Sequence, residues 1–199
     1  MKILRIFLAI FAFSLLMAAA KSPVRAPAQL PVYGEVPDFS LIEKSGRPVG
    51  ASDLKGRVWI ADFIFTHCAG PCPLMSSRMS QLQQKWAENP KMGFLSFSVD
   101  PDRDSPAVLN KYAERYGAKE GWLFLTGDKK QIYDLISRNF HLGVGDVPAE
   151  ERDAVDQMVR HSTKFVLLDR DLRIRGYYDS DNPQAMGQLE KDAANLLSE

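Results

Sequence analysis

The hydrophobic and polar positions of this chain change their spacing several times, and each change predicts a new element. Residues 58–65, with the sequence VWIADFIF, are rich in β-branched and aromatic side chains and are apolar on nearly both faces. Such a run is typical of a buried parallel strand. Four apolar residues then recur at helical spacing, namely Met75, Met79, Leu82 and Trp86. This spacing predicts a helix over about 73–87, with a proline in its first turn.

The alternation of strands and helices continues to the end of the chain. It predicts further strands over 92–99, 122–126, 163–169 and 174–178, and helices over 105–116, 129–140 and 183–197. Residues 141–160 form a charged insertion that starts with a glycine turn. Near the N-terminus, the apolar run 39–42 and the turn-forming residues 44–48 predict a short hairpin. The chain is therefore predicted to be an α/β protein, a mixed sheet with helices on both faces and an N-terminal β-hairpin extension.

The first twenty residues do not belong to this pattern. Lys2 and Arg5 precede an almost uninterrupted apolar run, and residues 17–20 (MAAA) are the small residues that a signal peptidase accepts. The apolar run 6–20 has 15 residues, fewer than the roughly 20 that a spanning helix needs. We therefore expect residues 1–20 to be a cleaved signal peptide, with an uncleaved N-terminal anchor as the alternative. Either one predicts an exported protein, in the periplasm or at the outer face of the inner membrane.

The rest of the chain divides into two segments. Residues 21–36 contain three prolines and show neither helical nor strand periodicity, so they are predicted to be an extended, proline-rich linker. Residues 37–199 carry the predicted strands and helices and are expected to form one domain.

The composition excludes several classes of protein. Of the 199 residues, 45% are hydrophobic and 25% are charged, which argues against a multi-span membrane protein and against a disordered chain. The 25 basic residues balance 25 acidic ones, and removal of residues 1–20 takes away Lys2 and Arg5, which leaves 23 basic residues against 25 acidic ones. Because there is no basic field, we expect no nucleic-acid partner. Contact with a membrane is expected only through the N-terminal segment.

The two cysteines of the chain, Cys68 and Cys72, lie in the segment 65–73 (FTHCAGPCP), between a predicted strand and a predicted helix. The carboxyl ends of strands are where α/β sheets build their sites, and a helix N-terminus stabilises thiolates. We therefore expect both thiols to ionise more readily than free cysteine. Two soft thiolates with an imidazole suit copper, Cu(I) in particular. A structural disulfide is the alternative, although so short a loop contributes only about 2 kcal/mol in the chain-entropy model.

The three histidines are candidates for completing a metal site. His161 precedes the strand 163–169 and could lie at the end of the sheet that carries the cysteines, with a solvated loop histidine as the alternative. The side chain of His67 should point away from the neighbouring cysteine, which favours a supporting or structural role. His141 follows a predicted helix, where an imidazolium would stabilise the C-terminal carbonyls. A structural zinc site would need a fourth ligand, which His67 or Asp100 would have to supply.

Three motifs, in this order, make the chain resemble the Sco/SenC family. They are FTHC-x3-CP over 65–73, SVDPDRDSP over 98–106 and a histidine followed by serine ahead of a strand. Members of this family are thioredoxin-like copper proteins that serve assembly of the dinuclear copper centre of cytochrome c oxidase. The resemblance runs from about residue 37 to the C-terminus and implies a thioredoxin-like sheet. It also implies copper, as Cu(I) or Cu(II), on Cys68, Cys72 and His161.

Two further details concern the match to the family. The family usually has proline directly after the first cysteine, where this chain has Ala69. Asp100 matches an acidic residue near the family's site and is a possible supporting residue, with a turn or helix-cap carboxylate as the alternative. Asp102 and Asp104 look like the start of the following helix.

Two functions are hypothesised. The first is a copper metallochaperone that passes copper to the copper-site subunit of cytochrome c oxidase or a similar cuproprotein, with another copper carrier as a further partner. The second is a thiol-disulfide oxidoreductase that reduces the target's cysteines, in which Cys68 attacks and Cys72 resolves the mixed disulfide. A thioredoxin-type oxidoreductase would have two residues between its cysteines, and this chain has three. A peroxiredoxin would have threonine at the position of Phe65.

Overall fold

The structure is a computed structural model that describes residues 29–147 and 159–199. Its strands are β1 (Gly34–Glu35), β2 (Ser40–Glu43), β3 (Pro48–Gly50), β4 (Val58–Ile64), β5 (Met92–Ser98), β6 (Trp122–Thr126), β7 (Val144–Asp146), β8 (Val159–His161), β9 (Lys164–Leu168) and β10 (Arg173–Asp179). Eight of them form one sheet in the order β1-β10-β9-β4-β5-β6-β2-β3, while β7 and β8 form a separate two-stranded sheet. The site described below depends on both sheets.

The centre of the large sheet is parallel and buried. β4 pairs in parallel with β5, β5 pairs in parallel with β6, and β9 runs antiparallel on the other side of β4. Every residue of β4 and β5 is buried. The register sets Trp59 opposite Gly93, where an added Cβ would lie 2.3 Å from the Trp59 ring, so the close approach of this ring requires glycine.

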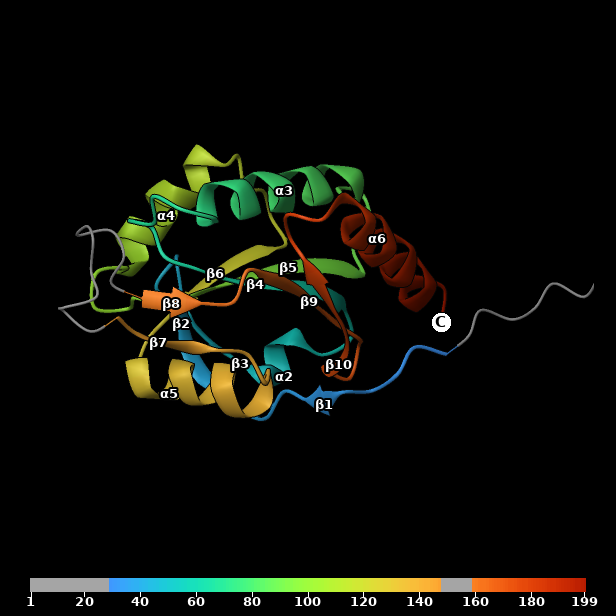
Figure 1. The fold of residues 1–199 in the computed structure, drawn as a ribbon, viewed down its shortest axis with the longest axis horizontal. Helices are drawn as coiled ribbons and strands as arrows, with labels where there is room; N and C mark the ends of the chain where they lie inside the picture. Colours follow the sequence, from blue (N-terminus) through green and yellow to red (C-terminus); the bar gives the residue numbers. More distant parts are fainter. Residues whose placement is uncertain (1–28, 148–158) are drawn as a thin grey trace, which may run out of the picture.

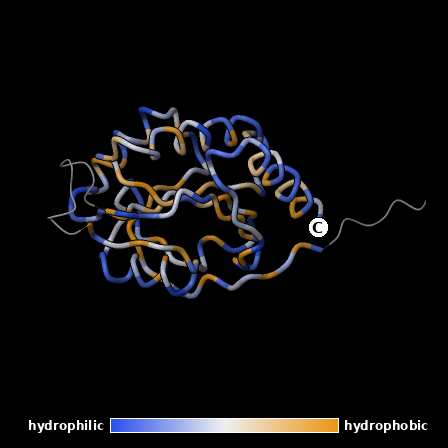
Figure 2. The backbone as a smooth tube through the Cα atoms, in the orientation of Figure 1, coloured by the Kyte–Doolittle hydropathy of each residue, from blue (hydrophilic) through white to orange (hydrophobic). Residues whose placement is uncertain are grey.

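Helices cover both faces of the sheet. They are α2 (Ala51–Leu54), α3 (Cys72–Lys85), α4 (Pro106–Arg115), α5 (Lys129–Asp134), its π-helical continuation η1 (Leu135–Asn139), and α6 (Pro183–Ser198). α3, α4 and α6 lie on one face, and α5 and α2 lie on the other (Figure 1). Along these helices hydrophilic and hydrophobic positions alternate (Figure 2), as expected for helices that bury one side. The predicted fold class is confirmed, including the β2–β3 hairpin, which pairs with β6.

The single helix predicted over 129–140 is in fact two different helices. The N–H of Phe140 donates to the carbonyl of Leu135 at 3.0 Å, five residues earlier, so the last turn is wider than an α-helical one. The wide turn accompanies the burial of Leu135, Ile136 and Phe140 together. No pattern of apolar residues distinguishes this turn from an ordinary helical one.

The insertion 141–160 contains two strands that its charged sequence did not predict. β7 and β8 pair antiparallel, with Val144 opposite His161, and form what we call the β7–β8 arm. Asp146 in β7 holds the arm to α5, because its carboxylate lies 2.9 Å from the ammonium of Lys129 and accepts from the Tyr133 hydroxyl at 3.0 Å. Residues 148–158 of the insertion lie outside the described residues.

The segment before residue 36 packs against the large sheet. β1 pairs antiparallel with β10, and the buried Arg175 donates to the carbonyls of Leu30 and Pro31 at 2.7 and 3.1 Å. Arg175 also forms an ion pair with Asp169 at 2.7 Å. The predicted signal peptide lies outside the described residues, and the domain boundary at residue 36 stays a prediction. Within the described ranges, no helix has the length and apolar character to cross a membrane.

Candidate metal centre

The two cysteines lie at the junction of the central strand β4 and helix α3. After β4 ends at Ile64, a turn over 65–68 is closed by the backbone N–H of Cys68, which donates to the carbonyl of Phe65 at 3.3 Å. Cys68 is half-buried, whereas Cys72, the first residue of α3, is fully buried. Pro71 precedes the helix and provides no side-chain cap, so the first N–H groups of α3 remain available to the loop.

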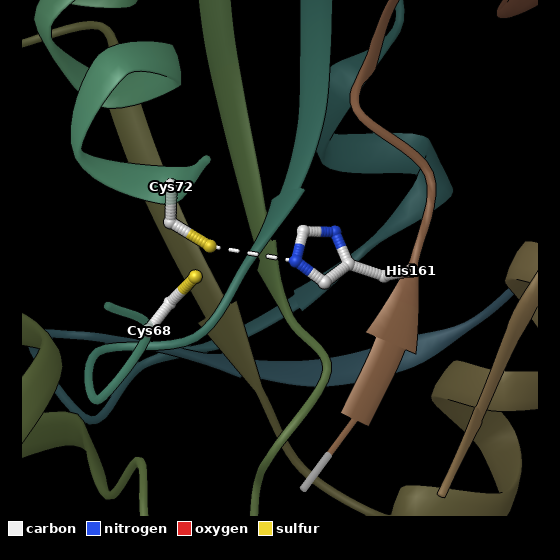
Figure 3. A group of neighbouring side chains, drawn as sticks. All are labelled: Cys68, Cys72 and His161. Atoms are coloured by element: carbon white, nitrogen blue, oxygen red, sulfur yellow. Dashed lines mark hydrogen bonds between the residues drawn. The ribbon is translucent and has the colours of Figure 1, made fainter. Parts of the chain in front are cut away.

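His161 comes to the cysteines from the β7–β8 arm. Its Nε2 lies 3.4 Å from Sγ of Cys72, and the ligand atoms of Cys68, Cys72 and His161 all lie within 4.8 Å of one another (Figure 3). Nδ1 of His161 lies 3.0 Å from the carbonyl of Ser162, which can only accept, so this nitrogen carries the proton. In the neutral ring the lone pair of Nε2 therefore faces the thiols. The ring of Phe65 packs edge-on against the imidazole, with 5.6 Å between centroids.

The pKa values of the two thiols are shifted in opposite directions. The pKa of Cys68 is lowered, mainly because its thiolate accepts a hydrogen bond from Cys72. The backbone N–H groups of Gly70 and Cys72 also lower it, against the opposing effect of burial. The pKa of Cys72 is raised, because its proton is held by Cys68 and because its side chain is buried. The expectation that both thiols ionise readily is therefore wrong for Cys72.

Sequence reasoning missed the buried carboxyl of Asp62, in the middle of β4. Asp62 is fully buried, and its Oδ1 accepts from the Ser96 hydroxyl at 2.6 Å. Its Oδ2 has no hydrogen-bond partner among the described residues. Burial raises the pKa of Asp62 to about 7, although the bond from Ser96 and the attraction of His161 act to lower it. The signal in the sequence was a single acidic residue within an otherwise apolar strand.

The other candidate residues do not join the cluster. Asp100 is buried after the end of β5, and its carboxylate is paired with Arg103. His67 is exposed and its Nδ1 lies 3.0 Å from the Thr66 hydroxyl, and the exposed His141 follows η1 with a φ of 52°. Among the described residues, the cluster thus offers three ligands, one fewer than a structural zinc site needs.

The fold and this cluster together define a class: a thioredoxin-like α/β protein with two thiols and one imidazole at the end of its central strand. The SCO1/SenC family model matches residues 29–196, and the chain belongs to this family.

Individual relatives agree with this assignment. A relative from Bacillus subtilis (strain 168), named SCO1 protein homolog, is 36% identical over 152 residues, which are 75% of this chain and 76% of the relative. A structure of BsSco, described as a member of the Sco family of cytochrome c oxidase assembly proteins with a disulfide switch, is 32% identical, with a TM-score of 0.71 and coverage of 85% of this chain and 98% of that chain. Bradyrhizobium japonicum ScoI with copper bound is 26% identical, with a TM-score of 0.63 and coverage of 79% of this chain and 98% of that chain.

Proposed function

We propose that this chain is an exported copper metallochaperone that holds copper on Cys68, Cys72 and His161. It delivers the metal to the copper-site subunit of cytochrome c oxidase or a similar cuproprotein. The observation that carries the proposal is the convergence of two sulfurs and one imidazole nitrogen within 4.8 Å of one another. Soft sulfur ligands with an imidazole are the donor set that copper favours.

Two relatives support the choice of metal and of target. Bradyrhizobium japonicum ScoI has been solved with copper bound, and BsSco is described among cytochrome c oxidase assembly proteins. The carbonyl of Ser162 supports the ligand role of His161, because it fixes the proton on Nδ1 and leaves Nε2 to the metal. The location in the periplasm or at the membrane's outer face rests on the basic, then apolar sequence of residues 1–20.

The uneven burial of the ligands suits transfer of the cargo. Cys68 is half-buried and precedes exposed residues, while Cys72 is fully buried. A thiol of the target can therefore approach from the side of Cys68 and replace its sulfur first. The copper would then pass by ligand exchange, with the buried sulfur released last.

The experiment is metal analysis and absorbance after Cu(II) is added to the reduced domain. We expect the wild type to retain stoichiometric copper with an intense thiolate-to-copper band, and Cys68→Ala and His161→Ala to lose that band. His141→Ala is the matched control, because this exposed histidine lies outside the cluster. The proposal fails if the wild type retains no stoichiometric copper, or if His161→Ala binds copper as well as the wild type.

A second function, thiol-disulfide oxidoreductase, is favoured by the opposite pKa shifts of the two thiols. The Cys68 thiolate would attack a disulfide of the target, form a mixed disulfide and release one target thiolate. Cys72 would then lose its proton and attack the sulfur of Cys68, which releases the second target thiol. The target disulfide is reduced, and the Cys68–Cys72 pair is oxidised.

The requirement for His161 distinguishes the two functions. Copper holding requires its imidazole, whereas the exchange steps need only the two sulfurs. If the oxidoreductase is the main activity, His161→Ala should still reduce a disulfide substrate in single turnover after it has lost copper. If the chaperone is the main activity, the wild type should be inert towards such substrates while it retains copper.

A further inference from the structure

The turn that presents Cys68 is tied to a distant part of the chain through one buried carboxylate. Asp104 is fully buried, and its Oδ1 accepts from the Thr66 hydroxyl at 2.5 Å. Its Oδ2 accepts from the backbone N–H of Thr66 at 3.1 Å and from the Ser98 hydroxyl at 2.7 Å. Thr66 thus bonds to both oxygens of a residue that lies 38 positions further along the chain.

Asp104 does not cap helix α4, although the sequence suggested that it belongs to the start of this helix. The N-cap is Ser105, whose hydroxyl accepts from the N–H of Val108, and Pro106 occupies the first turn. The carboxylate bonds that the described structure gives Asp104 run to Thr66 and Ser98 instead. The expected role is therefore wrong for Asp104, because its side chain turns inward to the end of β5.

Only a short stretch of chain separates the hydrogen bonds of Asp104 from Cys68. Thr66 is inside the turn over 65–68 that the Cys68 N–H closes, and it lies two residues before Cys68. A carboxylate buried in this way is costly unless its hydrogen bonds are made, so the surroundings hold it in one position. Fixing both the N–H and the hydroxyl of Thr66 fixes the direction in which the chain leaves β4.

We infer that Asp104 is a positioning residue for the Cys68 thiol. Through Thr66 it holds the turn so that Sγ of Cys68 stays close to Sγ of Cys72 and Nε2 of His161. The inference rests on the proposed function for its copper readout only. The closeness of the two sulfurs can also be measured without any metal, as the equilibrium between the dithiol and the disulfide.

The experiment compares four variants: Asp104→Asn, Thr66→Val, Thr66→Ser and Asp102→Asn. Asparagine keeps the shape of Asp104, but its amide nitrogen cannot accept a hydrogen bond. Valine keeps the shape of Thr66 without the hydroxyl, whereas serine keeps the hydroxyl. Asp102→Asn is the matched control in the same loop, because the side chain of Asp102 is 71% exposed and its one described ion pair is to Lys129.

Each protein is equilibrated in glutathione redox buffer, where oxidation of the two cysteines is balanced by reduction of glutathione disulfide. We expect Asp104→Asn and Thr66→Val to disfavour the protein disulfide by about tenfold, the size expected from losing a hydrogen bond to a charged group. Thr66→Ser and Asp102→Asn should stay within about twofold of the wild type. The rate of copper loss to a chelator should rise in the same two variants.

A merely structural role predicts a different pattern. The inference is overturned if Asp104→Asn lowers the melting temperature but leaves the disulfide equilibrium within about twofold of the wild type. If that variant does not fold, the comparison of Thr66→Val with Thr66→Ser decides, and equal equilibria in these two overturn the inference. A wild type that binds no copper would refute the proposed function and leave the disulfide test intact.

Discussion

The two halves of the ligand cluster are supported in very different ways. Cys68 and Cys72 follow a strand of seven residues that is buried along its whole length, and a 14-residue helix begins at Cys72. His161 ends a three-residue strand of the separate β7–β8 arm. The described side chains that hold this arm to α5 are Tyr133 and Lys129, which both reach Asp146.

This difference indicates a division of labour within one site. The hydrophobic core holds the thiol half, so its geometry should persist as long as the fold does. The imidazole half is less deeply buried, because Val159 is the one buried residue of β7 and β8, and the polar contacts of Asp146 with α5 lie at the surface. Elements with few buried apolar contacts open at a lower cost than a core does. We therefore expect substitutions near the two halves to differ in size as well as in kind.

Phe63→Ala should have the largest effect. Phe63 is fully buried in β4, and its ring lies 5.6 Å from that of Phe97 and 5.1 Å from that of Phe140. Loss of this ring should lower the free energy of unfolding by about 3–5 kcal/mol. Val159→Ala on the arm, which removes two carbon atoms, should cost only about 1.5 kcal/mol. Urea denaturation of both variants measures the difference, and equal losses would contradict the division.

Asp62→Asn tests the carboxyl beneath the thiol half. The folded-state pKa of about 7 exceeds the ordinary 3.8, so the neutral form stabilises the fold. This contribution is fully present below pH 3.8 and is lost as the pH rises through about 7. At about 1.4 kcal/mol per pKa unit, the loss is on the order of 4 kcal/mol. Asp62→Asn should remove this pH dependence and be more stable than the wild type at pH 8.

The measurement is urea denaturation of the reduced, metal-free proteins at pH 5 and pH 8. Asp102→Asn serves as the control, because the exposed Asp102 should leave the pH profile of the wild type unchanged. Parallel profiles for Asp62→Asn and the wild type would show that the carboxyl does not titrate as burial predicts.

Tyr133→Phe should have a smaller effect, confined to the imidazole half. The substitution removes a hydroxyl that lies 3.0 Å from Oδ1 of Asp146 and 3.2 Å from the carbonyl of Val99. We expect a loss of about 1 kcal/mol and faster amide exchange in β7 and β8, with exchange in β4 and β5 unchanged. Hydrogen exchange followed by mass spectrometry checks this, and equal acceleration in β4 would count against it.

Lys129→Gln should have the smallest effect. Lys129 lies between Asp146, at 2.9 Å, and Asp102, at 3.5 Å, and is 32% exposed. An ion pair at this exposure contributes about 0.5 kcal/mol, and salt screens it. The difference in melting temperature from the wild type should vanish at roughly 1 M salt. A difference that survives high salt would mean that the lysine packs rather than pairs.

The sequence predicted the thiol half much better than the imidazole half. Long runs such as 58–65 reveal β4, and the helix after Pro73 was expected within one residue of its start at Cys72. Strands of two or three residues, such as β1 and β8, are too short to show a period, so no pattern predicts them. The approach of His161 to Cys72 is a contact between residues 89 positions apart, which depends on how the arm folds back. The inward turn of Asp104 is likewise decided by packing and not by local preference.

Arg175 also fixes the place where the N-terminal segment joins the domain, because it bonds to the carbonyls of Leu30 and Pro31. β1 pairs with the first residues of β10, which lie beside Leu168 and hence Trp59, at the start of β4, whereas the cysteines follow the end of β4. β1 therefore lies towards the start of β4, and the described segment before it runs away from the α3 end of that strand (Figure 1). A tether through the residues that precede β1 would therefore hold the domain at the end of β4 opposite to the cysteines, and would leave Cys68 and Cys72 on the far side.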